Sequence, residues 1–132
     1  MDIFLDTEFI GFKSLHPLSV GLCPLNAKLP PAYFELEVDQ PDISRLDEED
    51  QFFMTTEVLC QLGISEQLRA LELIGVRTLR SNFSELEGAI YKYLKACSEV
   101  AACTKEKIWL ISDYSGDFDV LRKFVNQEYL NG

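Results

Sequence analysis

Two acidic residues near the amino terminus have the type and spacing of a metal-binding pair. Asp6 and Glu8 lie two positions apart in the otherwise apolar segment 3–10. In a β-strand, positions i and i+2 point to the same face, so the two carboxylates project together. Neighbouring carboxylates repel each other and are costly to desolvate unless a cation compensates them, and Mg²⁺ prefers such oxygen ligands. The alternative is an edge strand whose acids simply face water.

A second group of acids follows the apolar run at residues 108–111. Asp113, Asp117 and Asp119 lie where this expected strand gives way to a helix, and sites in open α/β sheets lie at the carboxyl ends of strands. Turn and helix-capping contacts are the ordinary interpretation of Asp113 and Asp117, and their contribution to a site stays open. Asp119 follows an aromatic residue in the first helical turn. We therefore expect Asp119 to join the amino-terminal pair.

The apolar pattern predicts the strands that position these acids. Runs rich in β-branched and aromatic residues at 3–10, 18–23 and 32–38 are typical of three consecutive antiparallel strands. Residues 108–111 are entirely apolar, which predicts a central parallel strand buried on both faces. Together with the helices between them, these strands predict an α/β layered domain.

Helical patterns occupy most of the remaining chain. Apolar residues recur at helical spacing over 51–74, with a break expected at Gly63. Ser84 and Glu87 have the spacing of a capping box, with Ser84 as the N-cap of the next helix. The apolar stripe of that helix consists of Leu86, Ile90, Tyr93, Leu94 and Cys97. A closing helix is expected from Val120 onward.

Length and composition limit the class of protein. A chain of 132 residues with 47% hydrophobic residues predicts one domain, residues 1–132, with one sizeable core. No apolar run reaches the roughly 18 residues of a membrane span, and the amino terminus lacks the basic region of a signal peptide. The cysteines contain no C-x-x-C pair, so we expect reduced, buried thiols in a cytoplasmic protein rather than zinc.

Charge is distributed unevenly along the chain. The net charge is −10, which disfavours a nucleic-acid partner because phosphate binding relies on Lys and Arg. Residues 1–66 hold 13 of the 22 acids and 3 of the 12 bases, whereas residues 67–132 hold the other 9 acids and 9 bases. A local basic patch and metal ions are enough for an enzyme that binds only a short single-stranded end.

Both acidic groups resemble the motifs of one enzyme family. Residues 4–9, Phe-Leu-Asp-Thr-Glu-Phe, resemble the first motif of the DEDD-type 3′→5′ exonucleases, and most of all the small bacterial and phage exoribonuclease-like members that read D-T-E-F. Residues 112–119 resemble the second motif, an aromatic residue and Asp just after the central strand. The resemblance covers nearly the whole chain and implies an RNase H-like fold: three antiparallel strands, then helices and a central parallel strand.

The resemblance also implies roles for the acids. A two-metal site with Mg²⁺ or Mn²⁺ would hydrolyse phosphodiester bonds at the 3′ end of RNA or single-stranded DNA. Asp6 would bridge both ions, Glu8 would hold the ion on the nucleophile side, and Asp119 would hold the ion on the leaving-group side. Phe9 and Ile10 are expected to form a wall for the terminal base, with a core role for at least one of them.

The chain departs from the family in its third motif, a His or Tyr general base shortly before a fourth Asp. His16 lies before the second strand, and no acid follows Tyr129. We therefore expect a domain that lacks its last strand and helix. Three explanations stay open: a longer chain that carries the third motif, a partner subunit or homodimer that supplies it, or a catalytically inactive protein. An inactive protein would bind or regulate a partner through the acidic segment 35–50.

Overall fold

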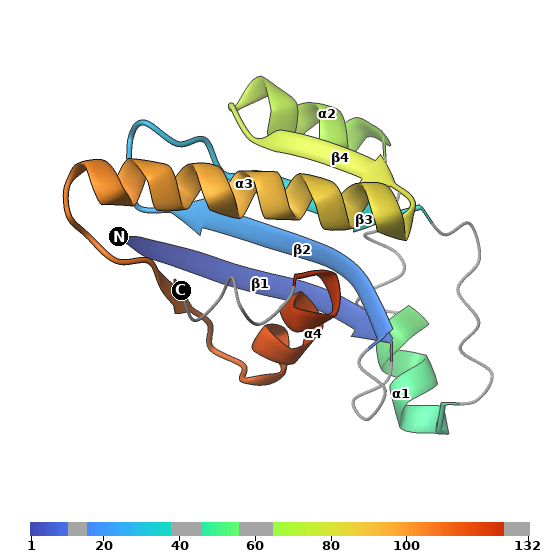
Figure 1. Cartoon of the computed structure of the whole chain (residues 1–132). Helices are drawn as coiled ribbons and strands as arrows, with labels where there is room; N and C mark the ends of the chain where they lie inside the picture. The colour runs from blue at the N-terminus through green and yellow to red at the C-terminus, as the bar shows by residue number, and fades with distance from the viewer. Residues whose placement is uncertain (11–15, 38–45, 56–64, 126–132) are drawn as a thin grey trace.

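A mixed β-sheet with helices packed against it forms the centre of the molecule (Figure 1). The computed structural model describes residues 1–10, 16–37, 46–55 and 65–125. In chain order, the strands in this part are β1 (Asp2–Ile10), β2 (His16–Pro24), β3 (Ala32–Leu36), β4 (Arg77–Ser81) and β5 (Trp109–Ile111). Their order across the sheet is β4-β3-β2-β1-β5. The expected α/β class is confirmed.

Strands β1, β2 and β3 form the expected antiparallel series. Leu5 pairs with Leu22 and Val20 pairs with Phe34, so these side chains share one face of the sheet. All four are buried in the main core together with Ile3. Because burying such a side chain contributes about 1.5–3 kcal/mol, this apolar face fixes the register of the three strands.

The two outer strands differ from the sequence-based prediction. Strand β4 was not expected, because its sequence has only one aliphatic residue; it pairs in parallel with β3, and Arg80 donates a hydrogen bond of 3.0 Å to the buried carboxylate of Glu35. Strand β5 pairs in parallel with β1 but lies at the edge of the described sheet. The prediction of a central strand buried on both faces is therefore wrong for this part of the chain. The core contacts β5 on its Leu110 side, while Trp109 is 64% exposed.

Two of the helices cover one face of the sheet. The described helices are α1 (Glu48–Phe53), α2 (Ser65–Leu73), α3 (Phe83–Cys103) and α4 (Gly116–Phe124). Helix α3 packs against β3 and β4, and α4 packs against β1 and β2 (Figure 1). The predicted apolar stripe of α3 is confirmed, since all five of its residues are buried. The break expected at Gly63 lies outside the described residues, between α1 and α2.

Helix α3 begins earlier than its sequence predicts. Its N-cap is Asn82, whose side chain accepts a hydrogen bond of 2.9 Å from the backbone N–H of Glu85. The prediction that Ser84 caps the helix is therefore wrong, because Ser84 already lies inside the first turn. The side chain of Glu85 accepts a further hydrogen bond from the hydroxyl of Ser81, at the end of β4. These contacts join the end of β4 to the start of the helix that covers the core.

The two candidate caps are distinguished by a pair of substitutions. Asn82→Ala should lower the free energy of unfolding by about 1 kcal/mol, because it leaves a backbone N–H of the first turn without its acceptor. Ser84→Ala should change it by less than about 0.5 kcal/mol, since alanine is the better helix former inside a helix. Urea unfolding followed by circular dichroism measures both values. Equal losses in the two variants would contradict the assignment of Asn82 as the cap.

Candidate functional site

Strand β1 presents Asp6 and Glu8 on the face of the sheet opposite the main core. Thr7, between them, is buried, whereas Asp6 is exposed and Glu8 is partly buried. Their partners on β2 are Gly21 and Ser19, which are among the smallest residues. Strand β1 lies between β2 and β5 in the sheet, but β5 pairs only with residues 2–4 of β1. Asp6 and Glu8 therefore lie just beyond the end of β5, where side chains from both faces of β1 reach the same space.

The two carboxylates line a cavity of about 240 Å³. One wall comes from β1, a second from the residues at the junction of β5 and α4, and a third from α1 and the residue that follows it. The lining residues are Asp6, Thr7, Glu8, Phe9, Asp50, Phe53, Met54, Asp113, Tyr114 and Asp117. Five of these residues are acids, and none of this described lining is basic. Like charges therefore converge on one small volume.

Asp117 is the most deeply buried acid of this cavity, with 2% of its surface exposed. The hydroxyl of Thr7 donates a hydrogen bond of 2.6 Å to its Oδ1 atom, and the hydroxyl of Ser112 donates one to its Oδ2 atom. The N-cap of α4 is Ser115, which makes no side-chain capping bond. Asp117 therefore makes more than turn or capping contacts: its side chain connects α4 to β1, 110 residues earlier in the chain.

Asp119 does not reach the cavity. Its side chain is 57% exposed and forms an ion pair of 2.9 Å with Arg122 on the outer surface of α4. Successive residues of a helix are rotated by about 100°, so Asp119 lies roughly 200° around the helix from Asp117. The expectation that Asp119 would lie with Asp6 and Glu8 is therefore not met, and the structure brings Asp117 and Asp113 to the pair instead.

The sequence contained a signal for this choice. Val120, Leu121 and Phe124 are the buried apolar residues of α4, and Asp117 precedes them at the spacing i, i+3, i+4, i+7. Extending this apolar stripe back by one turn selects Asp117 as the acid that faces the sheet. Asp119 falls outside the stripe.

Burial and mutual repulsion raise the affinity of these acids for protons. The pKa of Glu8 is raised to about 7, first by burial, then by the charge of Asp6 and then by that of Asp117. The pKa of Asp6 is also raised, by the partial desolvation of its carboxylate and by the charges of Asp117 and Asp113. The raised pKa values of Glu8 and Asp6 indicate that no positive charge compensates these two carboxylates. The same imbalance favours the binding of a cation.

An aromatic stack closes one side of the cavity. The rings of Phe9 and Tyr114 are stacked, with centroids 5.9 Å apart and planes inclined by 19°. Ile10 belongs instead to a small second core, which it forms with Leu18 and Met54. Of the two residues expected to form a wall, Phe9 thus lines the cavity, and Ile10 has the core role.

The carboxylates that line the cavity are of the ligand type that binds divalent cations, but they are not gathered as closely as the ligands of a bound ion. Their oxygens are the hard ligands that Mg²⁺ and Mn²⁺ take. Among the residues that the structure describes, no group of three or more His, Cys, Asp or Glu side chains is gathered closely enough to hold a metal ion.

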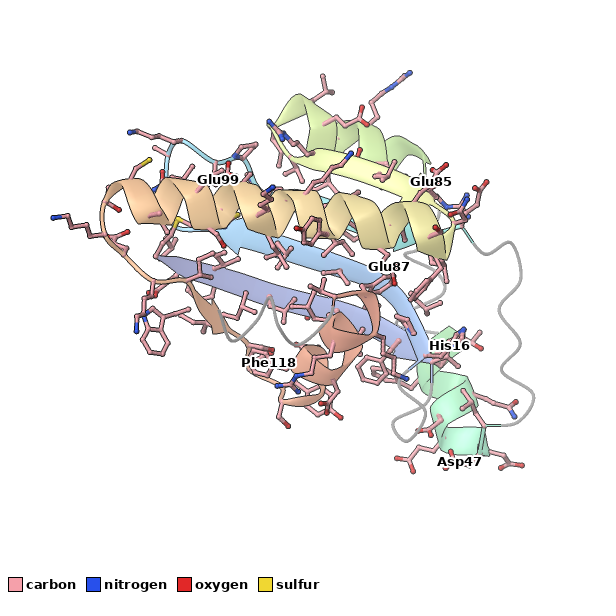
Figure 2. The ribbon with its side chains drawn as sticks, viewed as in Figure 1. His16, Asp47, Glu85, Glu87, Glu99 and Phe118 are labelled. Atoms are coloured by element: carbon pink, nitrogen blue, oxygen red, sulfur yellow. The ribbon has the colours of Figure 1, made fainter. Side chains whose placement is uncertain are left out.

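The other residues singled out in the sequence lie away from this cavity. His16 is exposed at the start of β2 (Figure 2). Tyr129 lies outside the described residues. Of the cysteines in the described ranges, Cys97 is buried, whereas Cys23 and Cys103 are exposed, so the expectation of buried thiols holds for only one of them.

Comparisons with known proteins do not assign this chain to a family. No family model matches it, and no curated protein or solved structure matches it either. None of the helices in the described ranges is long and apolar enough to span a membrane.

The raised pKa of Glu8 predicts a pH-dependent effect of Glu8→Gln. The folded-state pKa of about 7 lies above the ordinary value of 4.5, so the folded chain retains a proton that the unfolded chain releases between these pH values. The stability that this proton contributes is complete below the ordinary pKa and is lost as the pH rises through about 7. Glutamine carries no such proton. The urea midpoint of Glu8→Gln relative to wild type should therefore rise from about pH 5 to about pH 8.

Glu99→Gln provides the control for this measurement. Glu99 is exposed on α3, the helix that covers the opposite face of the sheet (Figure 2). Its urea midpoint should follow that of the wild type at every pH. Parallel curves for all three proteins would contradict the assignment of a retained proton to Glu8.

Proposed function

We propose that this chain is a metal-dependent 3′→5′ exonuclease that hydrolyses phosphodiester bonds at the 3′ end of RNA or single-stranded DNA. The observation that carries the proposal is the convergence of Asp6, Glu8 and the buried Asp117 on one cavity with no basic residue in its described lining. Such an arrangement stores negative charge that only a cation or bound protons can neutralise. Divalent-cation chemistry on phosphate esters is the reaction class that makes use of it.

The strand arrangement supports an RNase H-like fold as part of this proposal. Three antiparallel strands open the chain, and after the intervening helices β5 joins β1 in parallel. This is the order that the resemblance to DEDD-type exonucleases implies. The additional strand β4 extends the sheet at its other edge, beyond β3, and leaves the arrangement around the acids unchanged.

The structure changes which acid we propose as the third ligand. Asp6, Glu8 and Asp117 would hold the cations, with Asp113 at the rim of the same cavity. Bound Mg²⁺ or Mn²⁺ would supply Lewis acidity, activating water and stabilising the leaving oxygen. The carboxylates would hold these metal ions, and so concentrate positive charge, where the end of the nucleic acid binds. This local charge offsets the net charge of −10, which otherwise repels a nucleic acid.

The aromatic stack of Phe9 and Tyr114 suits the base of a nucleotide, as the metal site suits its phosphate. Phe9 and Tyr114 present apolar aromatic surface beside the carboxylates. Bases stack on such rings with little dependence on sequence. The cavity therefore combines a phosphate-directed end with a base-directed end.

Metal binding tests the proposal and separates the two candidate third ligands. Wild-type protein titrated with Mn²⁺ in a calorimeter should release heat that saturates, and Asp117→Asn should abolish this signal, because a buried ligand charge is lost. Asp119→Asn is the matched control: it removes a surface ion pair on the same helix, so its Kd should stay within about twofold of the wild-type value. Loss of binding in Asp119→Asn with retention in Asp117→Asn would overturn the assignment. Absence of binding by the wild type at millimolar Mn²⁺ would overturn the metal site.

Cleavage is a separate measurement. Single-stranded RNA labelled at its 5′ end should be shortened stepwise from its 3′ end in Mn²⁺, and a 3′-phosphorylated copy should resist. Metal binding together with intact RNA would instead favour the alternative of a catalytically inactive binding or regulatory protein. Residues 47–50, at the start of α1, are the described acids through which such a protein would bind its partner.

A further inference from the structure

Thr7 lies between the two acids of β1 but points to the opposite face of the sheet. It is 4% exposed, and its hydroxyl donates the 2.6 Å hydrogen bond to Oδ1 of Asp117. Because side chains alternate along a strand, Thr7 cannot act as a ligand on the face that carries Asp6 and Glu8. It can instead reach the helix that packs against the core face. Thr7 therefore contacts the acid that completes the cavity.

Ser112 approaches the same carboxylate from the end of β5. Its hydroxyl donates to Oδ2 of Asp117 and accepts a hydrogen bond of 3.1 Å from the backbone N–H of Tyr114. The same oxygen lies 3.0 Å from the carbonyl oxygen of Tyr114. A serine hydroxyl has a single hydrogen, and a carboxylate is a stronger acceptor than a carbonyl, so this hydrogen is directed to Asp117.

These two hydroxyls fix the carboxylate without saturating it. Each oxygen of Asp117 accepts one hydroxyl, and an ionised carboxylate offers about four acceptor positions in total. Acceptor capacity therefore remains on a side chain that lines the cavity. The result is a buried acid held in one orientation and able to accept a cation.

We propose that Thr7 and Ser112 are positioning residues, whose hydroxyls hold Asp117 in the orientation in which it binds a divalent cation. The inference rests on the proposed metal site and extends it to two residues that do not touch the ion. It gives the middle residue of the Asp6-Thr7-Glu8 segment a chemical requirement: a hydroxyl on a small side chain. It also joins three segments, β1, the end of β5 and the first turn of α4, at a single carboxylate.

The test uses Thr7→Val, which removes the hydroxyl and keeps the shape, and Thr7→Ser, which restores the hydroxyl. Mn²⁺ titration calorimetry should give Thr7→Val a Kd roughly 10–100-fold weaker than that of the wild type, the usual effect of losing a hydrogen bond to a ligand. Thr7→Ser should recover most of this loss. Ser112→Ala should weaken binding in the same direction. Urea unfolding of each variant establishes that the titrated protein is folded.

Ser81→Ala is the matched control. Ser81 is also buried, and its hydroxyl also donates to a carboxylate, that of Glu85 at the start of α3, which does not line the cavity. Its loss should lower the urea midpoint and leave the Kd for Mn²⁺ unchanged. An equal weakening of metal binding in Ser81→Ala, or no rescue by Thr7→Ser, would show a merely structural role and overturn the inference.

The outcomes separate this inference from the function on which it rests. A wild-type protein that binds no Mn²⁺ overturns both. A wild-type protein that binds Mn²⁺, loses it in Asp117→Asn and keeps it unchanged in Thr7→Val overturns the positioning role alone. Weakening in Thr7→Val with recovery in Thr7→Ser supports both.

Discussion

The alternation of side chains along β1 is the constraint on which the rest of the structure depends. Ile3, Leu5 and Thr7 point into the core face, so Asp6 and Glu8 must point away from it. A shift of one residue in register would bury both acids under α3 and α4 and expose the apolar residues. The pairing of β1 with β2 holds the acids in this register, and β5, which pairs with residues 2–4 of β1, ends just before them. The cavity forms where these acids meet the start of α4.

Gathering acids at one place opposes folding unless something offsets their charge. Each desolvated carboxylate costs several kcal/mol when it is unpaired. Two means of relief are visible. Glu8 and Asp6 have raised pKa values and so take up protons more readily, whereas Asp117 receives two hydroxyl donors. A site of this kind is less stable than an apolar alternative, and such a cost is typical of residues arranged for function.

The buried pair of Glu35 and Arg80 shows the contrasting way to accommodate an acid. Glu35 is 1% exposed, yet it accepts hydrogen bonds from Arg80 and from the hydroxyl of Tyr33. A cationic side chain is thus supplied within the fold where the acid has a structural role. Around Asp6, Glu8 and Asp117 the described lining supplies none. The difference between the two places distinguishes a structural carboxylate from one left available to a ligand.

The sequence by itself determined the α/β class, the antiparallel series β1 to β3, the apolar stripe of α3 and the pairing of Asp6 with Glu8 on one face. These features follow from local periodicity, which each segment carries alone. Tertiary structure decided the rest. Strand β4 forms because β3 provides a partner for it. Strand β5 lies at the edge of the described sheet because it pairs with β1 on one side only. The cap of α3 falls at Asn82, where the chain leaves β4. The third acid is Asp117 rather than Asp119 because the phase of α4 is set by which of its faces packs on the sheet. The apolar stripe of α4 indicates this phase in the sequence, but it does not say what Asp117 meets; the contact between β1 and α4, 110 residues apart, decides that.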